Sequence, residues 1–360
     1  MARILHQFLA GALPGDAITD QALLLRKWLR AWQFSSDIFA EHVDPSLSGE
    51  VQQALAYRPQ RGESLCIYHH SIGSTLVERF IASNRRLLLI YHNVTPPHFL
   101  MAVDPPLAQR ATAGRRQLEQ LLPLSDLALA DSPYNERELA LAGFGRTGVL
   151  PIMLDESQYQ GITDSEIISR HAQQAPLLLF VGRLAPNKRQ EDLVKLLFYV
   201  RRLHPNAHLV LVGENWMPAY TAWLRDFVGQ VGLTQAVTLT GRVSQEKMVS
   251  YYHRADFYVS MSEHEGFGKP LLESMHLGLP VLAYAAAAVP STLGDAGILF
   301  HKKDYPVIAE LIDLLLRRPD LRQRLVVKGR ERATAFSPEQ VSEHFRMYLE
   351  AAGVALKRGE

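Results

Sequence analysis

DFYVSMSEHEGFGKPLLE, residues 256–273, combines an apolar run, a glycine-containing loop and the first turn of a helix. The run Asp256–Ser260 predicts a strand. Gly266 and Gly268 allow a tight turn and let backbone N–H groups approach a ligand. Pro270 suits the first helical position, and a helix N-terminus favours an anion. Open α/β sheets bind ligands at such strand ends, so the stretch predicts a parallel sheet with a ligand site at its carboxyl edge.

Apolar runs of strand length alternate with helical patterns outward from this stretch, in two sets. The strands predicted in the first set are Arg3–Phe8, Ser36–Val43, Ser64–His70, Arg86–His92, Leu127–Asp131 and Val149–Leu154. Those in the second set are Leu177–Val181, His208–Val212, Ala236–Leu239, Asp256–Ser260 and Val281–Tyr284. A helix is expected over Asp20–Trp32. Near-continuous apolar strands joined by helices indicate parallel sheets covered on both faces.

The expected fold class is therefore α/β, with two Rossmann-like parallel-sheet domains facing across a cleft. The first domain is predicted over residues 1–157 and the second over 177–337, with a polar linker at 158–176. A C-terminal helix, at about 338–360, is expected to return to the first domain after an interruption near Phe336–Pro338.

Length and composition exclude several classes of protein. A chain of 360 residues is long enough for two cores, and its 47% hydrophobic content is that of an ordinary globular protein. The formal charge of +1 gives no support for nucleic acid as the main partner. One cysteine excludes an intrachain disulfide. No apolar run approaches the ~20 residues that span a bilayer, so we expect a cytoplasmic protein, at most peripheral on the inner face of the membrane.

One glycine motif in the first half imitates a dinucleotide fingerprint. Residues 143–148, GFGRTG, fit G-x-G-x-x-G, but a helical pattern precedes them and a strand follows. A dinucleotide site needs the opposite order, with the helix after the glycines. The motif is better interpreted as a helix C-cap and turn, which argues against an oxidoreductase.

Two carboxylates lie in the glycine-containing loop and in the helix that follows it. Glu265 lies on the loop, where it can accept hydrogen bonds from sugar hydroxyls, and Glu273 lies one turn into the helix, where it can bind a ribose diol. The simpler alternative is that Glu273 complements the helix dipole and Glu265 is solvated. The glycine turn and the strand–loop–helix context favour the functional interpretation.

The segment EGFGKPLLESMHLGLPVLAY resembles the signature of family 4 retaining glycosyltransferases, which have the GT-B fold. The resemblance implies that Glu265 contacts the transferred sugar and Glu273 the nucleotide ribose. Lys269 departs from the family pattern, in which an apolar residue is usual. The implied donor contacts continue along the segment: Gly266, Phe267, Gly268, Lys269, Pro270 and Leu271.

A second cluster, FVGRLAPNK at residues 180–188, follows the strand Leu177–Val181. Gly182 ends the strand, and Arg183 and Lys188 offer two cations to a diphosphate leaving group. A solvated basic loop is the alternative. The cluster is similar to the family's G-R-x-x-x-x-K element, in which these residues hold the pyrophosphate.

Other predicted elements contain further candidate site residues, with less specific motifs. The resemblance places Gly213 and the backbone of Arg242 and Val243 beside the nucleotide, and Gly15 and Asp16 in a loop over the donor phosphates. His70 and His92 end predicted strands, where a histidine can orient the reacting sugar, although a surface or capping role is the alternative. His69 competes with His70 for this role.

The sequence contains no metal-ligand pattern, so we expect that the protein needs neither a metal nor another cofactor. The resemblance implies that it is a hexosyltransferase. The resemblance implies a nucleotide-diphosphate sugar as donor, a glycan or lipid-linked acceptor, and a role in cell-surface polysaccharide synthesis. A nucleotide-sugar epimerase of the same fold and a non-catalytic nucleotide-sugar-binding protein remain alternatives. Phe99–Met101 and the nearby Arg110, Arg115 and Arg116 suggest either contact with an anionic membrane or ordinary packing with a solvated helix face.

Overall fold

The computed structural model describes residues 3–60, 63, 65–161 and 163–356, so Ser64 and residues 357–360 lie outside the described residues. The chain divides into two compact units. The first comprises residues 1–101, 105–153 and 336–360, and the second comprises residues 102–104 and 154–335. The described residues of the segment 158–176, expected as a linker, lie in the second unit and include the end of η5 (Glu156–Tyr159) and all of α5 (Ser165–Arg170).

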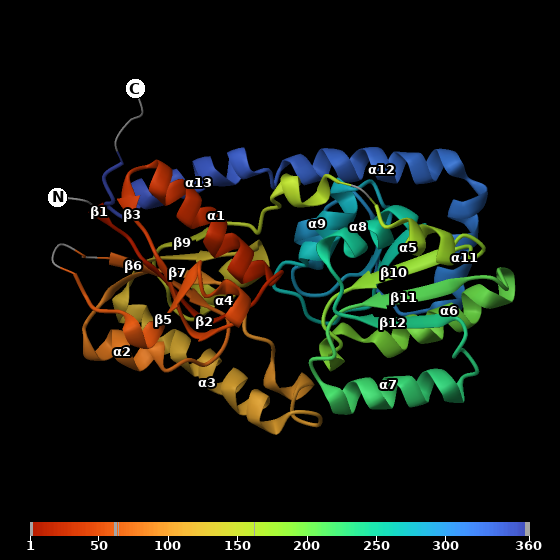
Figure 1. The fold of residues 1–360 in the computed structure, drawn as a ribbon, viewed down its shortest axis with the longest axis horizontal. Helices are drawn as coiled ribbons and strands as arrows, with labels where there is room; N and C mark the ends of the chain where they lie inside the picture. Colours follow the sequence, from red (N-terminus) through yellow and green to blue (C-terminus); the bar gives the residue numbers. More distant parts are fainter. Residues whose placement is uncertain (1–2, 61–62, 64, 162, 357–360) are drawn as a thin grey trace. The chain divides into compact units, whose positions relative to one another are not determined.

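The first unit is built on a seven-stranded parallel sheet (Figure 1). Its strands run in the order β5 (Val51–Gln53), β4 (Ile38–Val43), β2 (Gln7–Ala12), β6 (Leu65–His70), β7 (Arg86–Tyr91), β8 (Ser125–Ala130) and β9 (Thr147–Val149). A separate parallel pair joins β1 (Arg3–Ile4) to β3 (Phe34–Ser35).

Helices cover both faces of this sheet. On one face α1 (Ala17–Ala31) and α13 (Pro338–Ala351) enclose a core in which Leu25 and Leu29 meet Phe345. The other face carries α2 (Leu76–Ala82) and α3 (Pro105–Leu121), and α4 (Pro133–Leu141) packs on β8 and β9 (Figure 1). Short 3-10 turns complete the unit: η1 (Pro45–Leu47), η2 (Ala54–Ala56), η3 (Pro97–Phe99) and η4 (Leu122–Leu124).

Tyr348 fixes α13 to the edge strand β9. The backbone N–H of Val149 donates to the Tyr348 hydroxyl at 3.0 Å. A Cβ atom at Gly148 would lie 2.5 Å from the Tyr348 ring, so only glycine leaves room for this close approach. A helix far away in the sequence thereby completes the core of the first unit.

The second unit contains a six-stranded parallel sheet (Figure 1). Its order is β12 (Val237–Gly241), β11 (His208–Val212), β10 (Leu177–Val181), β13 (Phe257–Ser260), β14 (Val281–Tyr284) and β15 (Ile298–Phe300). One face carries α6 (Gln190–Leu203), α7 (Pro218–Gln230) and α11 (Tyr305–Arg317). The other carries α5, α8 (Gln245–Arg254), α9 (Lys269–His276) and α12 (Pro319–Thr334), while η6 (Pro186–Lys188) and α10 (Val289–Leu293) lie in loops.

Two parallel-sheet units confirm the predicted α/β fold class. Several predicted strand boundaries were wrong. The strand predicted over Arg3–Phe8 is divided between β1 and β2, and the one predicted over Val149–Leu154 ends at Val149. Pro151 has no N–H to continue the ladder there. No helix in the described part of the chain is long and apolar enough to cross a membrane.

Candidate functional site

Adjacent strands bring the two predicted clusters together in the second unit. β10 and β13 are paired neighbours, so the loops that follow them meet at the carboxyl edge of the sheet. The Lys188 Nζ lies 2.6 Å from Glu265 Oε2, and both side chains are largely buried. Arg183 follows the same strand as Lys188, with its guanidinium 4.7 Å from the centre of the Trp216 ring. The structure therefore gathers a carboxylate and two cations at one strand edge.

Backbone contacts hold the loop that carries Glu265 on both flanks. The Glu263 N–H donates to the Asn187 carbonyl at 2.9 Å, and the Asn187 side-chain amide donates to the His264 carbonyl at 3.2 Å. On the other flank, the Thr292 hydroxyl donates to the Phe267 carbonyl at 2.6 Å. The position of Glu265 is thus set by the loop's neighbours.

Glycines permit the close backbone approaches at this edge. A Cβ atom at Gly213 would lie 1.9 Å from the Gly182 carbonyl oxygen, so no other residue fits there. Gly268 has φ of +87° and precedes α9 directly. Gly266 and Phe267 lie in the loop, whereas Pro270 and the buried Leu271 form the first turn of α9.

Glu273 is buried in α9, with one tyrosine on each carboxylate oxygen. Tyr159 donates to Oε1 at 2.7 Å and Tyr252 donates to Oε2 at 2.5 Å. Lys269 Nζ lies 3.8 Å from Oε1. Burial and the neighbouring Glu273 raise the pKa of Tyr252 well above its ordinary value, so this hydroxyl keeps its proton and acts as a donor.

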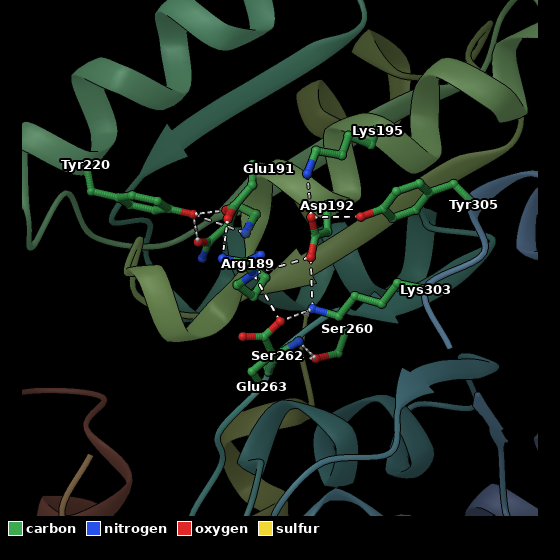
Figure 2. Close-up of polar contacts among 11 residues, drawn as sticks. Arg189, Glu191, Asp192, Lys195, Tyr220, Ser260, Ser262, Glu263, Lys303 and Tyr305 are labelled. Atoms are coloured by element: carbon green, nitrogen blue, oxygen red, sulfur yellow. Dashed lines mark hydrogen bonds and ion pairs between the residues drawn. The ribbon is translucent and has the colours of Figure 1, made fainter. Parts of the chain in front are cut away.

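A cluster of charged side chains lies around the start of α6, which follows Lys188 in the sequence (Figure 2). At its centre is the buried Asp192, which accepts hydrogen bonds from Lys303 at 2.8 Å, Lys195 at 2.9 Å and Tyr305 at 2.9 Å. Burial alone would raise the pKa of Asp192, but these donors outweigh it and lower the pKa to about 2. The carboxylate is therefore ionised at neutral pH.

Arg189 connects this cluster to the turn that carries Lys188. Its backbone adopts the left-handed conformation, with φ of +54°. Its guanidinium lies within 3.4 Å of carboxylate oxygens of Glu191, Asp192 and Glu263, and Figure 2 shows Glu263 also reaching Lys303. These ion pairs offset the strain of a non-glycine residue in this conformation.

Arg242 and Val243 lie elsewhere in the second unit, after β12. They line a hollow of about 500 Å³ together with residues of α5 and α8, including Lys247 and Tyr251. Neither Lys188 nor Glu265 lines this hollow. The structure thus places Arg242 and Val243 beside a hollow that the charged pair does not line, and their contact with the base stays a prediction.

In the first unit, Asp16 has a capping role. Its Oδ2 accepts hydrogen bonds from the backbone N–H groups of Ile18 at 3.2 Å and Thr19 at 3.4 Å at the start of α1. Gly15 precedes it with φ of +70°, and a Cβ atom added there would have no neighbouring atom within 4 Å. A phosphate contact by either residue stays a prediction.

His69 and His70 lie on opposite faces of the sheet in the first unit. His69 Nδ1 lies 2.8 Å from His92 Nε2, whereas His70 faces the other way, with its Nε2 2.8 Å from the Gly114 carbonyl oxygen. Side chains alternate along β6, which sends these neighbours to opposite faces. Burial lowers the pKa of His70 to about 4, although the bond to Gly114 acts in the other direction. The structure brings His69, not His70, together with His92.

His92 belongs to a buried chain of hydrogen bonds that runs from Gln7 to Asp131. The Gln7 amide donates to the Ala22 carbonyl at 2.9 Å, so its oxygen accepts from His69 Nε2 at 2.9 Å. His69 Nδ1 must then accept from His92 Nε2. One proton is therefore shared between His92 Nδ1 and Asp131 Oδ2, which are 3.0 Å apart. Both His92 ring nitrogens are engaged in this arrangement.

The side chains expected to contact a membrane are partly engaged within the protein. Leu100 is buried, and Arg115 donates to Glu138 at 2.9 Å and to the Val94 carbonyl at 2.6 Å. Met101 is 53% exposed. This geometry favours ordinary packing for Leu100 and Arg115.

Sequence reasoning missed the residues that hold the site in place. Tyr159 lies in the segment predicted as the linker, and Tyr252 and Asp192 were given no role. Their signal is weak, because a tyrosine or a first-turn aspartate has many structural uses. Among the described residues, no group of three His, Cys, Asp or Glu could hold a metal ion, and metal independence stays a prediction.

Comparison with known proteins finds a family match in the second unit. Residues 162–332 match the glycosyl transferases group 1 family. The D-inositol 3-phosphate glycosyltransferase of Streptosporangium roseum is 28% identical over 310 residues, which cover 81% of this chain and 69% of that protein. A GDP-mannose-dependent monoacylated alpha-(1-6)-phosphatidylinositol monomannoside mannosyltransferase of Corynebacterium glutamicum is 29% identical over 168 residues. That match spans 44% of this chain and only 43% of the mannosyltransferase.

A solved structure agrees at the level of the fold. HepE of Anabaena, in complex with UDP-glucose, superimposes with a TM-score of 0.76 at 17% identity, covering 96% of this chain and 99% of HepE. The predicted GT-B architecture is thereby confirmed. The matched residues 162–332 and these relatives therefore agree with the resemblance to this family of glycosyltransferases, and the fold extends over nearly the whole chain.

Proposed function

We propose that the protein transfers a hexose, with retention of anomeric configuration, from a nucleotide-diphosphate sugar to a hydroxyl of a glycan or lipid-linked acceptor. The observation that carries the proposal is the 2.6 Å pair of Lys188 and Glu265 at the carboxyl edge of β10 and β13. Arg183 follows the same strand, and Glu273 lies one turn into the adjacent helix. Relatives whose names specify mannosyl transfer from GDP-mannose to a phosphatidylinositol mannoside support the choice of donor and acceptor class.

Lys188 and Arg183 are assigned to the diphosphate of the donor. An ammonium group has three donors, so Lys188 can bind a phosphate oxygen while it keeps one bond to Glu265. Negative charge grows on the diphosphate as the glycosidic bond breaks, and two fixed cations stabilise that charge most in the transition state. We propose on the same reasoning that no divalent ion is required.

Glu265 is assigned to the transferred sugar and Glu273 to the ribose. The second oxygen of Glu265 can accept hydrogen bonds from sugar hydroxyls while Lys188 neutralises the carboxylate. Arg242 and Val243 would contact the base. The acceptor hydroxyl would attack on the face from which the diphosphate departs, and the leaving phosphate would take its proton.

A role in cell-surface polysaccharide synthesis is the setting that we propose for this reaction. Contact with an anionic membrane surface is not needed for the proposal. Leu100 and Arg115 already have partners inside the first unit.

The first experiment is a panel of nucleoside diphosphates and their sugars. A nucleotide at 100 times its Kd should stabilise the protein by about 2.7 kcal/mol, measured as a shift in Tm. UDP- and GDP-sugars are then incubated with and without glycan and lipid-linked acceptors. Acceptor-dependent release of the diphosphate with an α-linked product from an α-linked donor supports retaining transfer. An altered nucleotide sugar formed without acceptor would identify an epimerase instead.

Replacing the charged pair tests the assignment of residues. Lys188→Met and Glu265→Gln should each lower turnover by about 100- to 1,000-fold, the scale of losing one preorganised stabilising group. Lys328→Met is the matched control, because Lys328 also makes a 2.6 Å ion pair, with Asp295, but on the surface of the same unit. Full turnover in Lys188→Met would remove Lys188 from the reaction.

A further inference from the structure

Glu273 has four acceptor positions, and the two tyrosines occupy half of them. An ionised carboxylate offers two lone-pair sites on each oxygen. Tyr159 occupies one site on Oε1 and Tyr252 occupies one on Oε2. Each oxygen therefore keeps one lone-pair site that neither tyrosine occupies. These two sites match the two hydroxyls of a ribose diol.

The tyrosines also restrict how the carboxylate can turn. Each of the two oxygens is held by a separate donor from a separate element, Tyr159 from η5 and Tyr252 from α8. All three side chains are buried, with Glu273 at 3%, Tyr159 at 5% and Tyr252 at 1% exposure. Rotation of the carboxylate about its terminal bond would break both hydrogen bonds inside the protein, where an unmade bond is costly.

Tyr159 is itself fixed from several sides. Its ring packs edge-on against His276 of α9 at 5.8 Å between centroids. The carbonyl of the preceding Gln158 accepts a hydrogen bond from the Gln245 side chain at 3.2 Å. Both α8 and α9 thus contact the 3-10 turn that presents this hydroxyl.

We infer that Tyr159 and Tyr252 are positioning residues, which hold the Glu273 carboxylate in the orientation that accepts the 2′- and 3′-hydroxyls of the donor ribose. This inference rests on the proposed function, in which Glu273 binds ribose. The two tyrosines act through Glu273 and determine selectivity for a ribonucleotide over a deoxyribonucleotide.

The test compares the Kd of UDP and GDP with those of 2′-deoxyUDP and 2′-deoxyGDP by calorimetry. Wild-type protein should prefer the ribonucleotide of the matching base by about tenfold, equivalent to about 1.4 kcal/mol. Tyr159→Phe and Tyr252→Phe, which each remove one hydroxyl, should reduce that preference to about threefold or less, mainly by weakening the ribonucleotide. The double variant should have almost no preference.

Tyr91→Phe is the control for loss of a buried tyrosine–carboxylate bond. Tyr91 donates to Glu138 at 3.0 Å in the first unit, so its replacement should leave the preference at the wild-type value. The preference is a ratio measured on folded protein, and lower stability alone does not change it. An unchanged preference in both tyrosine variants would overturn the inference and leave the ribose role of Glu273 intact. Absence of any preference in the wild type would overturn that role as well.

Discussion

The shared proton between Asp131 and His92 leads to a prediction about a single side chain. Asp131→Asn keeps an N–H donor toward His92 Nδ1, so the chain from Gln7 to Asp131 can persist. Asp131→Leu leaves that buried nitrogen without a partner and should cost about 1–3 kcal/mol of stability, whereas Asp131→Asn should cost less than about 1 kcal/mol. Urea unfolding of the two variants measures the difference.

An equal loss in both variants would show that an ionised Asp131 is required. Burial raises the pKa of Asp131, while the neighbouring His92 opposes this effect. Asp131 Oδ1 is also buried without a hydrogen-bond partner among the described residues. Both observations favour the neutral acid, which asparagine imitates.

Single residues at strand ends could be predicted from the sequence, but their partners could not. Glu265 and Lys188 follow apolar strands, and parallel strands bring such residues to one edge. The sequence predicted the site from that rule. Which histidine of His69 and His70 meets His92 depends on the register of β6, and an unbroken apolar run gives no sign of which face each side chain takes.

At the scale of an element, the turn from η6 into α6 depends on a strained residue. Arg189 has φ of +54° and makes ion pairs with three carboxylates. Arg189→Gly and Arg189→Ala remove the same ion pairs, but only glycine adopts this conformation without strain. We therefore expect the glycine variant to be the more stable by about 1 kcal/mol.

Urea unfolding of the second unit measures this comparison, with wild type as the common reference. Arg318→Gly and Arg318→Ala serve as controls, because Arg318 also pairs with a carboxylate, that of Asp320, but has a negative φ of −119°. At position 318 the alanine variant should be more stable than the glycine variant. Greater stability of Arg189→Ala over Arg189→Gly would contradict the left-handed turn.

Elements with long apolar runs could be predicted well, and short or interrupted ones could not. β10, β11 and β14 begin and end at the predicted residues, since each is a largely apolar run with a proline before it or a glycine after it. β5 and β15 have three residues each, too few for any periodicity to appear. The strand predicted to continue beyond Val149 stops because Pro151 follows.

At the scale of the whole molecule, buried histidines in both units make stability sensitive to acid. Burial lowers the pKa of five histidines: His6, His69, His70, His171 and His208. A histidine whose pKa is lower in the folded state binds fewer protons there than in the unfolded chain. Its contribution is complete above the unfolded pKa of about 6.5 and is lost as the pH falls toward the folded pKa.

We predict that His70→Gln makes the free energy of unfolding less dependent on pH. His70 has a folded pKa of about 4, so it should account for about 2 kcal/mol of the stability lost between pH 7 and pH 5. Glutamine keeps a donor for the Gly114 carbonyl and does not titrate. Urea unfolding of the first unit at pH 7, 6 and 5 gives the slope, and His98→Gln, at an exposed position on η3 of the same unit, is the control. An unchanged slope in His70→Gln would mean that His70 titrates normally.

The return of α13 to the first unit has a consequence for the order in which the chain is completed on the ribosome. The first unit's core needs Val341, Phe345 and Leu349, which follow the whole of residues 154–335 in the sequence. At about 5–20 residues per second, synthesis of that intervening segment takes roughly 10–40 s. During this interval the nascent first unit has Leu25 and Leu29 without the helix that covers them. Synthesis of the first unit therefore starts before that of the second, yet the first unit obtains the last helix of its core only after residues 154–335 have been made.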